Sequence, residues 1–285
     1  MKRHKFIKTG MIAAVACALS LVAGASAADD AQAASKVHPW NGKKVVYLGD
    51  SITAPSSVQK YWKFLQDIYG IESHVYATGG YQWSHAYSMA QKMRTEMGDS
   101  PDAILILLGT NDYQASVPLG EWFRMEREEV NRNGKSASLL RRHFITDMGT
   151  FRGRINTVMS YLKHNFPDQQ IVLMTPIHRG YATFGPTNVQ PPESFPNGLG
   201  IYFDEYVRVL REAADIWSVP LIDLYRDSGL LPTDSAFAKY FCDGGDKGKD
   251  NLHPNNLGHL RLSHTIAARL CTLPSDFKTS CGEKE

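Results

Sequence analysis

Short apolar segments alternate with amphipathic segments along most of the chain. Five segments are rich in apolar residues and end near turn-forming residues, as strands do: residues 44–48, 72–77, 103–108, 171–174 and 221–224. Five others repeat apolar residues at helical spacing: residues 58–69, 84–97, 146–166, 202–217 and 257–270. Residues 103–108 are apolar throughout, as is typical of a strand that helices bury on both faces. The alternation therefore predicts βαβ units and an α/β fold with a parallel sheet.

Two long segments, residues 113–144 and 178–201, interrupt this alternation. The first contains a charged stretch, residues 124–132, whose mixed signs are typical of a solvated helix face. The second contains four prolines. Each segment follows the carboxyl end of a predicted strand, where open α/β sheets bind ligands. We expect both segments to form walls of a substrate site.

The composition is that of an ordinary globular protein. The chain has 285 residues, of which 43% are hydrophobic and 21% charged, so it can build a core and lacks the charge excess of a disordered protein. This excludes a collagen, a coiled coil, a low-complexity polymer and a protein with many membrane spans. We find no internal repeat and no domain boundary.

The first residues are typical of a secretory signal peptide. Residues 1–8 carry four basic side chains, residues 11–24 form an uncharged apolar run, and Ala25-Ser26-Ala27 fits a cleavage site. The run is shorter than the roughly 20 residues of a membrane span. We therefore predict a signal peptide at 1–27, a linker at 28–36, one domain at 37–285, and export to the periplasm or the exterior. A retained anchor and a lipoprotein attached at Cys17 are the weaker alternatives.

Removal of this leader changes the charge of the protein. The full chain has 31 basic and 29 acidic residues, and removing the four basic residues of the leader leaves 27 against 29. The near-neutral mature protein gives no indication of a nucleic-acid partner or of integral membrane association. The sequence leaves the oligomeric state open.

Three cysteines remain after the leader is removed: Cys242, Cys271 and Cys281. An exported compartment permits disulfides, so Cys271–Cys281 and Cys242–Cys271 are competing pairs. The chain has no CxxC pair, which argues against a redox motif or a thiolate zinc site.

Three polar motifs lie at the ends of predicted strands or before the last helix. Gly49-Asp50-Ser51 follows the first strand and would expose a serine near a helix N-terminus, although serine also commonly caps helices. Gly109-Thr110-Asn111-Asp112 follows the third strand and offers an amide, although these residues also form turns. Asp250 and His253 are three residues apart, so the carboxylate could orient the imidazole as a base, or the two could be a surface pair.

Together, these motifs resemble those of the SGNH (GDSL-type) hydrolase family, over residues 44 to about 270. The resemblance implies a three-layer α/β/α sandwich, flavodoxin-like, with about five parallel strands. It also implies Ser51 as the nucleophile, His253 as the general base and Asp250 as the residue that orients it. The oxyanion hole would use the N–H of Ser51, the Asn111 side chain and the N–H of Gly80, with Gly79 as the alternative.

The remaining features are assigned no catalytic role. We expect Asp112 and Asn255 to be structural, and we expect no cofactor and no metal, because the histidines lack H-E-x-x-H spacing and the aspartates near Asp250 lack EF-hand spacing. The absence of G-x-S-x-G argues against the α/β-hydrolase fold.

Nine aromatic residues are candidates for the rim of the site: Tyr81, Trp83, Tyr113, Trp122, Phe123, Tyr181, Phe184, Tyr202 and Phe203. Such a rim suits stacking on sugar rings. The resemblance and the rim together predict a serine esterase that removes acetyl groups from a polysaccharide or a smaller carbohydrate ester. A lipase, lysophospholipase or thioesterase is the alternative within the family, and an inactive glycan-binding protein is the alternative of another class.

Overall fold

The computed structural model describes residues 38–242 and 249–277. The predicted signal peptide, the linker at 28–36 and Cys281 lie outside the described residues. Within the described part, we find no helix that is both long and apolar enough to cross a bilayer.

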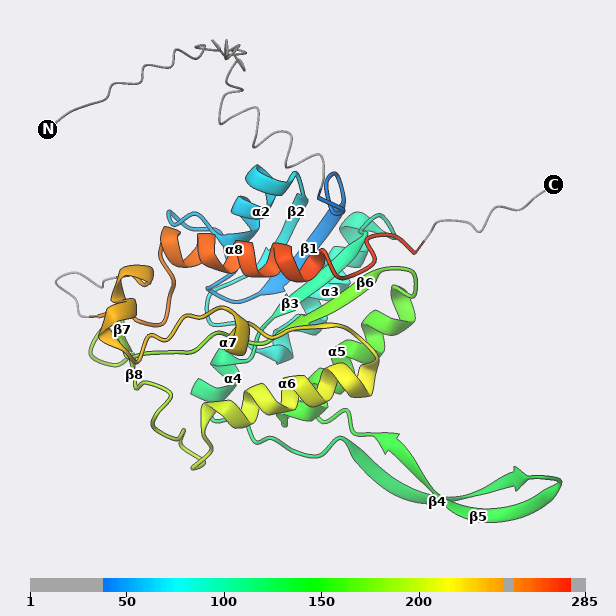
Figure 1. Ribbon diagram of the computed structural model, residues 1–285. Coiled ribbons are helices and arrows are strands. Elements are labelled where there is room, and N and C mark those ends of the chain that lie inside the picture. Colours follow the sequence, from blue (N-terminus) through cyan, green and yellow to red (C-terminus); the bar gives the residue numbers. More distant parts are fainter. Residues whose placement is uncertain (1–37, 243–248, 278–285) are drawn as a thin grey trace, which may run out of the picture.

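The centre of the fold is one parallel sheet of five strands in the order β2-β1-β3-β6-β9 (Figure 1). The strands are β1 (Lys44–Gly49), β2 (Glu72–Ala77), β3 (Ala103–Leu107), β6 (Gln170–Met174) and β9 (Leu221–Ile222). Every residue of β3 and β6 is buried, as expected for strands covered on both faces. Since β1 and β3 are neighbours, the motifs that follow them emerge at the same edge of the sheet.

Helices cover both faces of the sheet and create two hydrophobic cores. The longer helices are α2 (Tyr61–Tyr69), α3 (Trp83–Met97), α5 (Phe151–Asn165), α6 (Phe203–Trp217) and α8 (Asn256–Leu270). Shorter helical segments are α4 (Thr110–Gln114), α7 (Leu224–Asp227) and the 3₁₀ segment η1 (Ser235–Tyr240). Helices α3, α5 and α6 pack on one face, and α2 and α8 pack on the other. The predicted three-layer α/β/α fold is confirmed.

Two predicted boundaries differ from the structure for local reasons. Helix α5 begins only at Phe151, because the Thr150 hydroxyl caps it by accepting from the Gly153 N–H. The strand predicted at 221–224 ends at Ile222, because the Asp223 side chain accepts from the Arg226 N–H and caps α7.

The charged stretch at 124–132 is a β-strand, and the prediction of a helix face was wrong. Strands β4 (Phe123–Arg132) and β5 (Lys135–Phe144) pair antiparallel and form a hairpin. Asn133 and Gly134 both have positive φ, at 55° and 78°, as the two-residue turn of a tight hairpin requires. Charged residues occupy both faces of β4, with four in a row from Glu126 to Glu129, and most of the hairpin is exposed. The pattern therefore lacks the one-sided apolar signal of a strand packed on a core.

This hairpin projects from the body of the protein and does not form a wall at the carboxyl ends of the strands (Figure 1). At its base, Phe144 stacks on Trp217 with ring centroids 4.4 Å apart. Trp217 ends α6, which leads directly into β9, so it lies near the amino ends of the strands. The expectation that residues 113–144 form a wall of the substrate site is therefore wrong for the hairpin.

Of the two competing disulfides, Cys242–Cys271 does not form. The Cys242 N–H donates to the carbonyl of His253, just before α8, whereas Cys271 follows the last residue of α8. A helix of 15 residues separates the two cysteines, which corresponds to roughly 22 Å. A disulfide requires Cα atoms within about 7 Å.

Candidate active site

Ser51 lies in a tight turn directly after β1. The carbonyl of Asp50 accepts from the N–H groups of Thr53 and Ala54, and the Asp50 carboxylate accepts from the Ile52 N–H at 3.0 Å. A β-carbon on Gly49 would lie 2.3 Å from Thr53 Oγ1, so only glycine permits this turn. The next helix, α2, begins ten residues later at Tyr61, so the expectations of a helix N-terminus or a helix cap at Ser51 were wrong.

The structure brings Ser51, His253 and Asp250 together. Ser51 Oγ lies 2.8 Å from His253 Nε2, and His253 Nδ1 lies 2.8 Å from Asp250 Oδ2. The second Asp250 oxygen accepts from the N–H groups of Leu252 and His253, which fixes the carboxylate. A base held in this way can take a proton from the serine hydroxyl.

Asn255 orients the loop that carries His253. Its side-chain oxygen accepts from the Leu257 and Gly258 N–H groups and caps α8. Its amide donates to the carbonyls of Lys239 and Phe241. The contacts agree with the structural role expected from the sequence.

Asn111 lies in the first turn of α4, close to the serine turn. Its amide donates to the Tyr81 carbonyl at 3.0 Å and to Asp50 Oδ2 at 3.3 Å. Gly109, the residue before α4, has a φ of 128°, which explains why glycine precedes the helix. An amide has two N–H donors, so both already have acceptors within the protein.

Gly79 and Gly80 lie on the loop after β2. A β-carbon on Gly79 would lie 3.8 Å from Ser51 Cβ, whereas Gly80 has a φ of 81° and open space at that position. The loop is therefore beside the serine, and the choice of Gly80 over Gly79 as the oxyanion donor stays a prediction.

Asp112 connects α4 to helices α3 and α5. It is fully buried, accepts from the Trp83 N–H at the start of α3, and forms an ion pair with Arg154 of α5 at 2.8 Å. Burial raises the pKa of its carboxyl to about 6 in spite of that arginine. The contacts agree with the expected structural role.

Two charged residues close to the serine were not singled out from the sequence. Lys60 is only 5% exposed, and its ammonium donates to the Ser51 carbonyl at 3.1 Å. Burial lowers its pKa. Burial also raises the pKa of Asp50 to about 6, and Lys60 acts against that rise. A single lysine before an amphipathic helix is normally solvated, so no sequence signal marks it as buried.

The segment 178–201 lies against the loop that carries Asp250 and His253, and its role as a wall of the substrate site stays a prediction. Ala182, in the short strand β7 (Ala182–Thr183), forms an antiparallel bridge with Asp250, and β7 pairs with β8 (Val189–Gln190). The Phe184 ring lies 5.3 Å from the His253 ring. Buried Arg179 anchors the segment by donating to the Thr110 carbonyl at 3.0 Å.

Only part of the predicted aromatic rim faces solvent near the site. Tyr181 and Phe184 are 39% and 43% exposed, Tyr202 is exposed, and Tyr81 is half-buried beside Asn111. Four of the nine aromatics belong to the core instead: Trp83, Tyr113, Trp122 and Phe203. Phe123 packs at the base of the hairpin, against Phe144.

A group of side chains that could hold a metal ion lies on the hairpin, far from Ser51. It consists of Glu126, Glu128 and His143. Arg124 pairs with Glu126 and Arg141 with Glu128, so arginines already neutralise both carboxylates.

Comparison with known proteins identifies the family of the chain. The profile of the GDSL-like Lipase/Acylhydrolase family matches residues 47–261, from β1 into α8, whereas no curated protein matches the sequence. The structure of a protein from Lactobacillus plantarum aligns with a TM-score of 0.61 at 26% identity, over 81% of this chain and 97% of the other. A "possible lipase" from Chitinophaga pinensis aligns at 0.56 and 17% identity, over 80% and 97%.

A salicylyl-acyltransferase from a tetracycline biosynthetic pathway aligns at 0.53 and 16% identity, over 82% of this chain and 56% of the other. At identities below 25%, the last two likenesses concern the fold alone. The matched profile spans most of the chain, and it includes all three motifs that the fold gathers at one edge of the sheet. The chain therefore belongs to the GDSL-like lipase/acylhydrolase family and is a hydrolase that acts on ester bonds.

Proposed function

We propose that the protein is an exported serine esterase that removes acetyl groups from carbohydrates, with Ser51 as its nucleophile. The observation that carries the catalytic part is the continuous hydrogen-bonded chain from Ser51 Oγ through His253 to Asp250, with 2.8 Å at each step. These three groups correspond to the nucleophile, the general base and the orienting carboxylate of such a site.

In the proposed reaction, Ser51 Oγ attacks the acyl carbon while His253 Nε2 accepts the hydroxyl proton. The carbonyl oxygen becomes negatively charged and is stabilised by the Ser51 N–H, the Asn111 amide and a glycine N–H, with Gly80 as the first candidate. His253 then donates its proton to the leaving alcohol. Water, deprotonated by His253, cleaves the acetyl-serine ester and restores the serine.

The surroundings of the catalytic loop offer hydrogen-bonding groups to a polar alcohol. Two hollows of about 390 and 210 Å³ border Asn251, and Lys249 lines both. Polar residues such as Ser194, Thr233 and Ser235 share the lining. The exposed rings of Tyr181 and Phe184 suit sugar rings.

Acetate release from acetylated xylan, compared with hydrolysis of p-nitrophenyl palmitate, tests the substrate class. We expect acetate release by the wild type, little palmitate hydrolysis, and loss of both activities in Ser51→Ala. A preference for palmitate would support a lipase instead. Full activity of Ser51→Ala would refute the nucleophile, and inactivity of the wild type on every ester would favour a binding protein.

Export is tested separately by secretion from the natural host and by N-terminal sequencing. We expect a mature protein that begins at Ala28, since Ala25-Ser26-Ala27 precedes this residue. A protein that retains Met1 in the cytoplasm would contradict export and leave the esterase proposal intact.

A further inference from the structure

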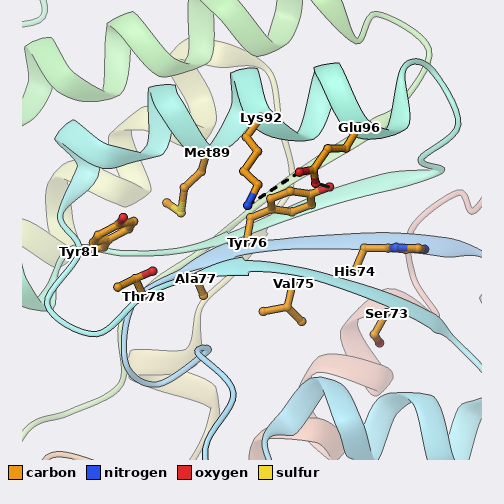
Figure 2. A pocket seen from close by; sticks show the side chains of 10 residues that line it. All are labelled: Ser73, His74, Val75, Tyr76, Ala77, Thr78, Tyr81, Met89, Lys92 and Glu96. Atoms are coloured by element: carbon orange, nitrogen blue, oxygen red, sulfur yellow. Dashed lines mark hydrogen bonds and ion pairs between the residues drawn. The ribbon is translucent and has the colours of Figure 1, made fainter.

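A groove of about 450 Å³ lies between the outer edge of β2 and helix α3 (Figure 2). Strand β2 is at the edge of the sheet, and among residues 38–242 and 249–277 it pairs with β1 alone. Six consecutive residues, 73–78, line the groove. At about 3.3 Å per residue, this strand gives the groove a length of roughly 20 Å.

One end of the groove adjoins the catalytic serine. Thr78 and Tyr81 line that end, and Gly79, between them, lies beside Ser51. The Tyr81 carbonyl accepts from the Asn111 amide at 3.0 Å. A long substrate that presents an ester to Ser51 can therefore continue over this loop and along β2.

The lining is polar and carries opposite charges that cancel. Tyr76 Oη donates to the Glu96 carboxylate at 2.9 Å, and Lys92 Nζ lies 3.8 Å from the same carboxylate (Figure 2). Carboxylate, ammonium and phenol groups donate to and accept from hydroxyl groups, and the paired charges leave no excess that would favour an anion or a cation. The Tyr81 ring stacks on His85 with centroids 4.3 Å apart, which fixes an aromatic surface at the catalytic end.

We propose that this groove binds the neighbouring sugar units of a neutral, hydroxyl-rich glycan while Ser51 deacetylates one unit. The inference rests on the proposed carbohydrate esterase function and adds the place where the rest of the glycan binds. A peptide that pairs with the free edge of β2 is the other occupant to test, but the Tyr76, Lys92 and Glu96 side chains favour hydroxyl groups.

The test compares kcat/KM for acetylated xylohexaose with kcat/KM for p-nitrophenyl acetate, which is too small to reach the groove. We expect Glu96→Ala and Tyr76→Ala to lower the hexaose-to-acetate ratio about tenfold, mainly through KM, as for the loss of a hydrogen bond to a charged group. Glu96→Gln, which keeps hydrogen-bonding capacity, should restore most of the ratio.

Lys63→Ala is the matched control, because Lys63 forms an exposed i,i+4 ion pair with Asp67 on α2, as Lys92 does with Glu96 on α3. This variant should keep the wild-type ratio. Chemical shifts of residues 73–78 in Ser51→Ala should change with unacetylated xylohexaose. Wild-type ratios in both groove variants, or shifts only with an extended peptide, would overturn the groove proposal. Absence of acetate release by the wild type would instead refute the proposed function.

Discussion

The Asn111→Ala substitution tests whether the amide beside the serine stabilises the transition state. This amide donates to the Tyr81 carbonyl at 3.0 Å and to Asp50 at 3.3 Å. To stabilise an oxyanion, it must exchange one of these bonds, and the longer bond to Asp50 is the easier one to give up.

Removal of one preorganised oxyanion donor typically costs about 10²–10³ in kcat, or about 2.7–4 kcal/mol. Preorganised donors cost nothing to reorient, whereas Asn111 must break a bond to a buried carboxylate. We therefore expect a loss near the lower limit, about 10²-fold in kcat with a nearly constant KM. The folded state should lose about 2–4 kcal/mol, because the substitution removes two hydrogen bonds and one of them is to a charged group.

Steady-state kinetics with p-nitrophenyl acetate and urea unfolding measure the two effects. Asn165→Ala is the control, because its amide also donates to a carbonyl, that of Tyr161, at the end of α5. This variant should lose about 1 kcal/mol of stability and keep its kcat. A kcat of Asn111→Ala within threefold of the wild type would refute the role of the amide.

Three further predictions follow from buried charges and from the hairpin. Arg154→Met should lower the free energy of unfolding by about 3–5 kcal/mol at pH 7, because it leaves the Asp112 carboxylate buried and unpaired. Because the pKa of Asp112 is raised above its ordinary value, the folded state binds the proton of this carboxyl more tightly than the unfolded state does. The loss of stability should therefore shrink between pH 7 and pH 5 in urea titrations. A loss that stays constant over this range would contradict the prediction. Lys60→Met should raise the pKa of Asp50 further above 6, which ¹³C-carboxyl NMR measures, and an unchanged midpoint would oppose the assigned electrostatics. Replacement of residues 124–143 by a two-residue turn should keep kcat/KM for p-nitrophenyl acetate within twofold, whereas a tenfold loss would mean that the hairpin contributes to catalysis.

The sequence by itself determined the order and type of the elements in the sheet and its covering helices. Residues 103–107 are apolar at every position and form a fully buried strand, as predicted. The helix predicted at 202–217 differs from α6 by one residue, because its apolar stripe packs directly on the core. These predictions succeed because burial on one or both faces leaves a local pattern in the chain.

The sequence also identified Ser51, Asn111, Asp250 and His253 as residues of one site. Their motifs follow neighbouring strands or precede the last helix, and the resemblance to a family gave their order a meaning. The prediction of a helix start at Ser51 was wrong, because a serine that follows a strand is equally common in a turn and at the start of a helix. The charged hairpin was misread for a related reason, since its solvated faces leave no periodic apolar signal.

Only the tertiary structure decided what lies around these residues. Lys60 is buried against the Ser51 carbonyl, both hydrogens of the Asn111 amide have acceptors, and a polar groove follows the outer edge of β2. Each feature joins residues from separate segments, so it depends on the packing of helices and loops on the sheet. A local sequence pattern indicates whether a residue is buried. The groups that a buried residue contacts depend instead on how distant parts of the chain pack together.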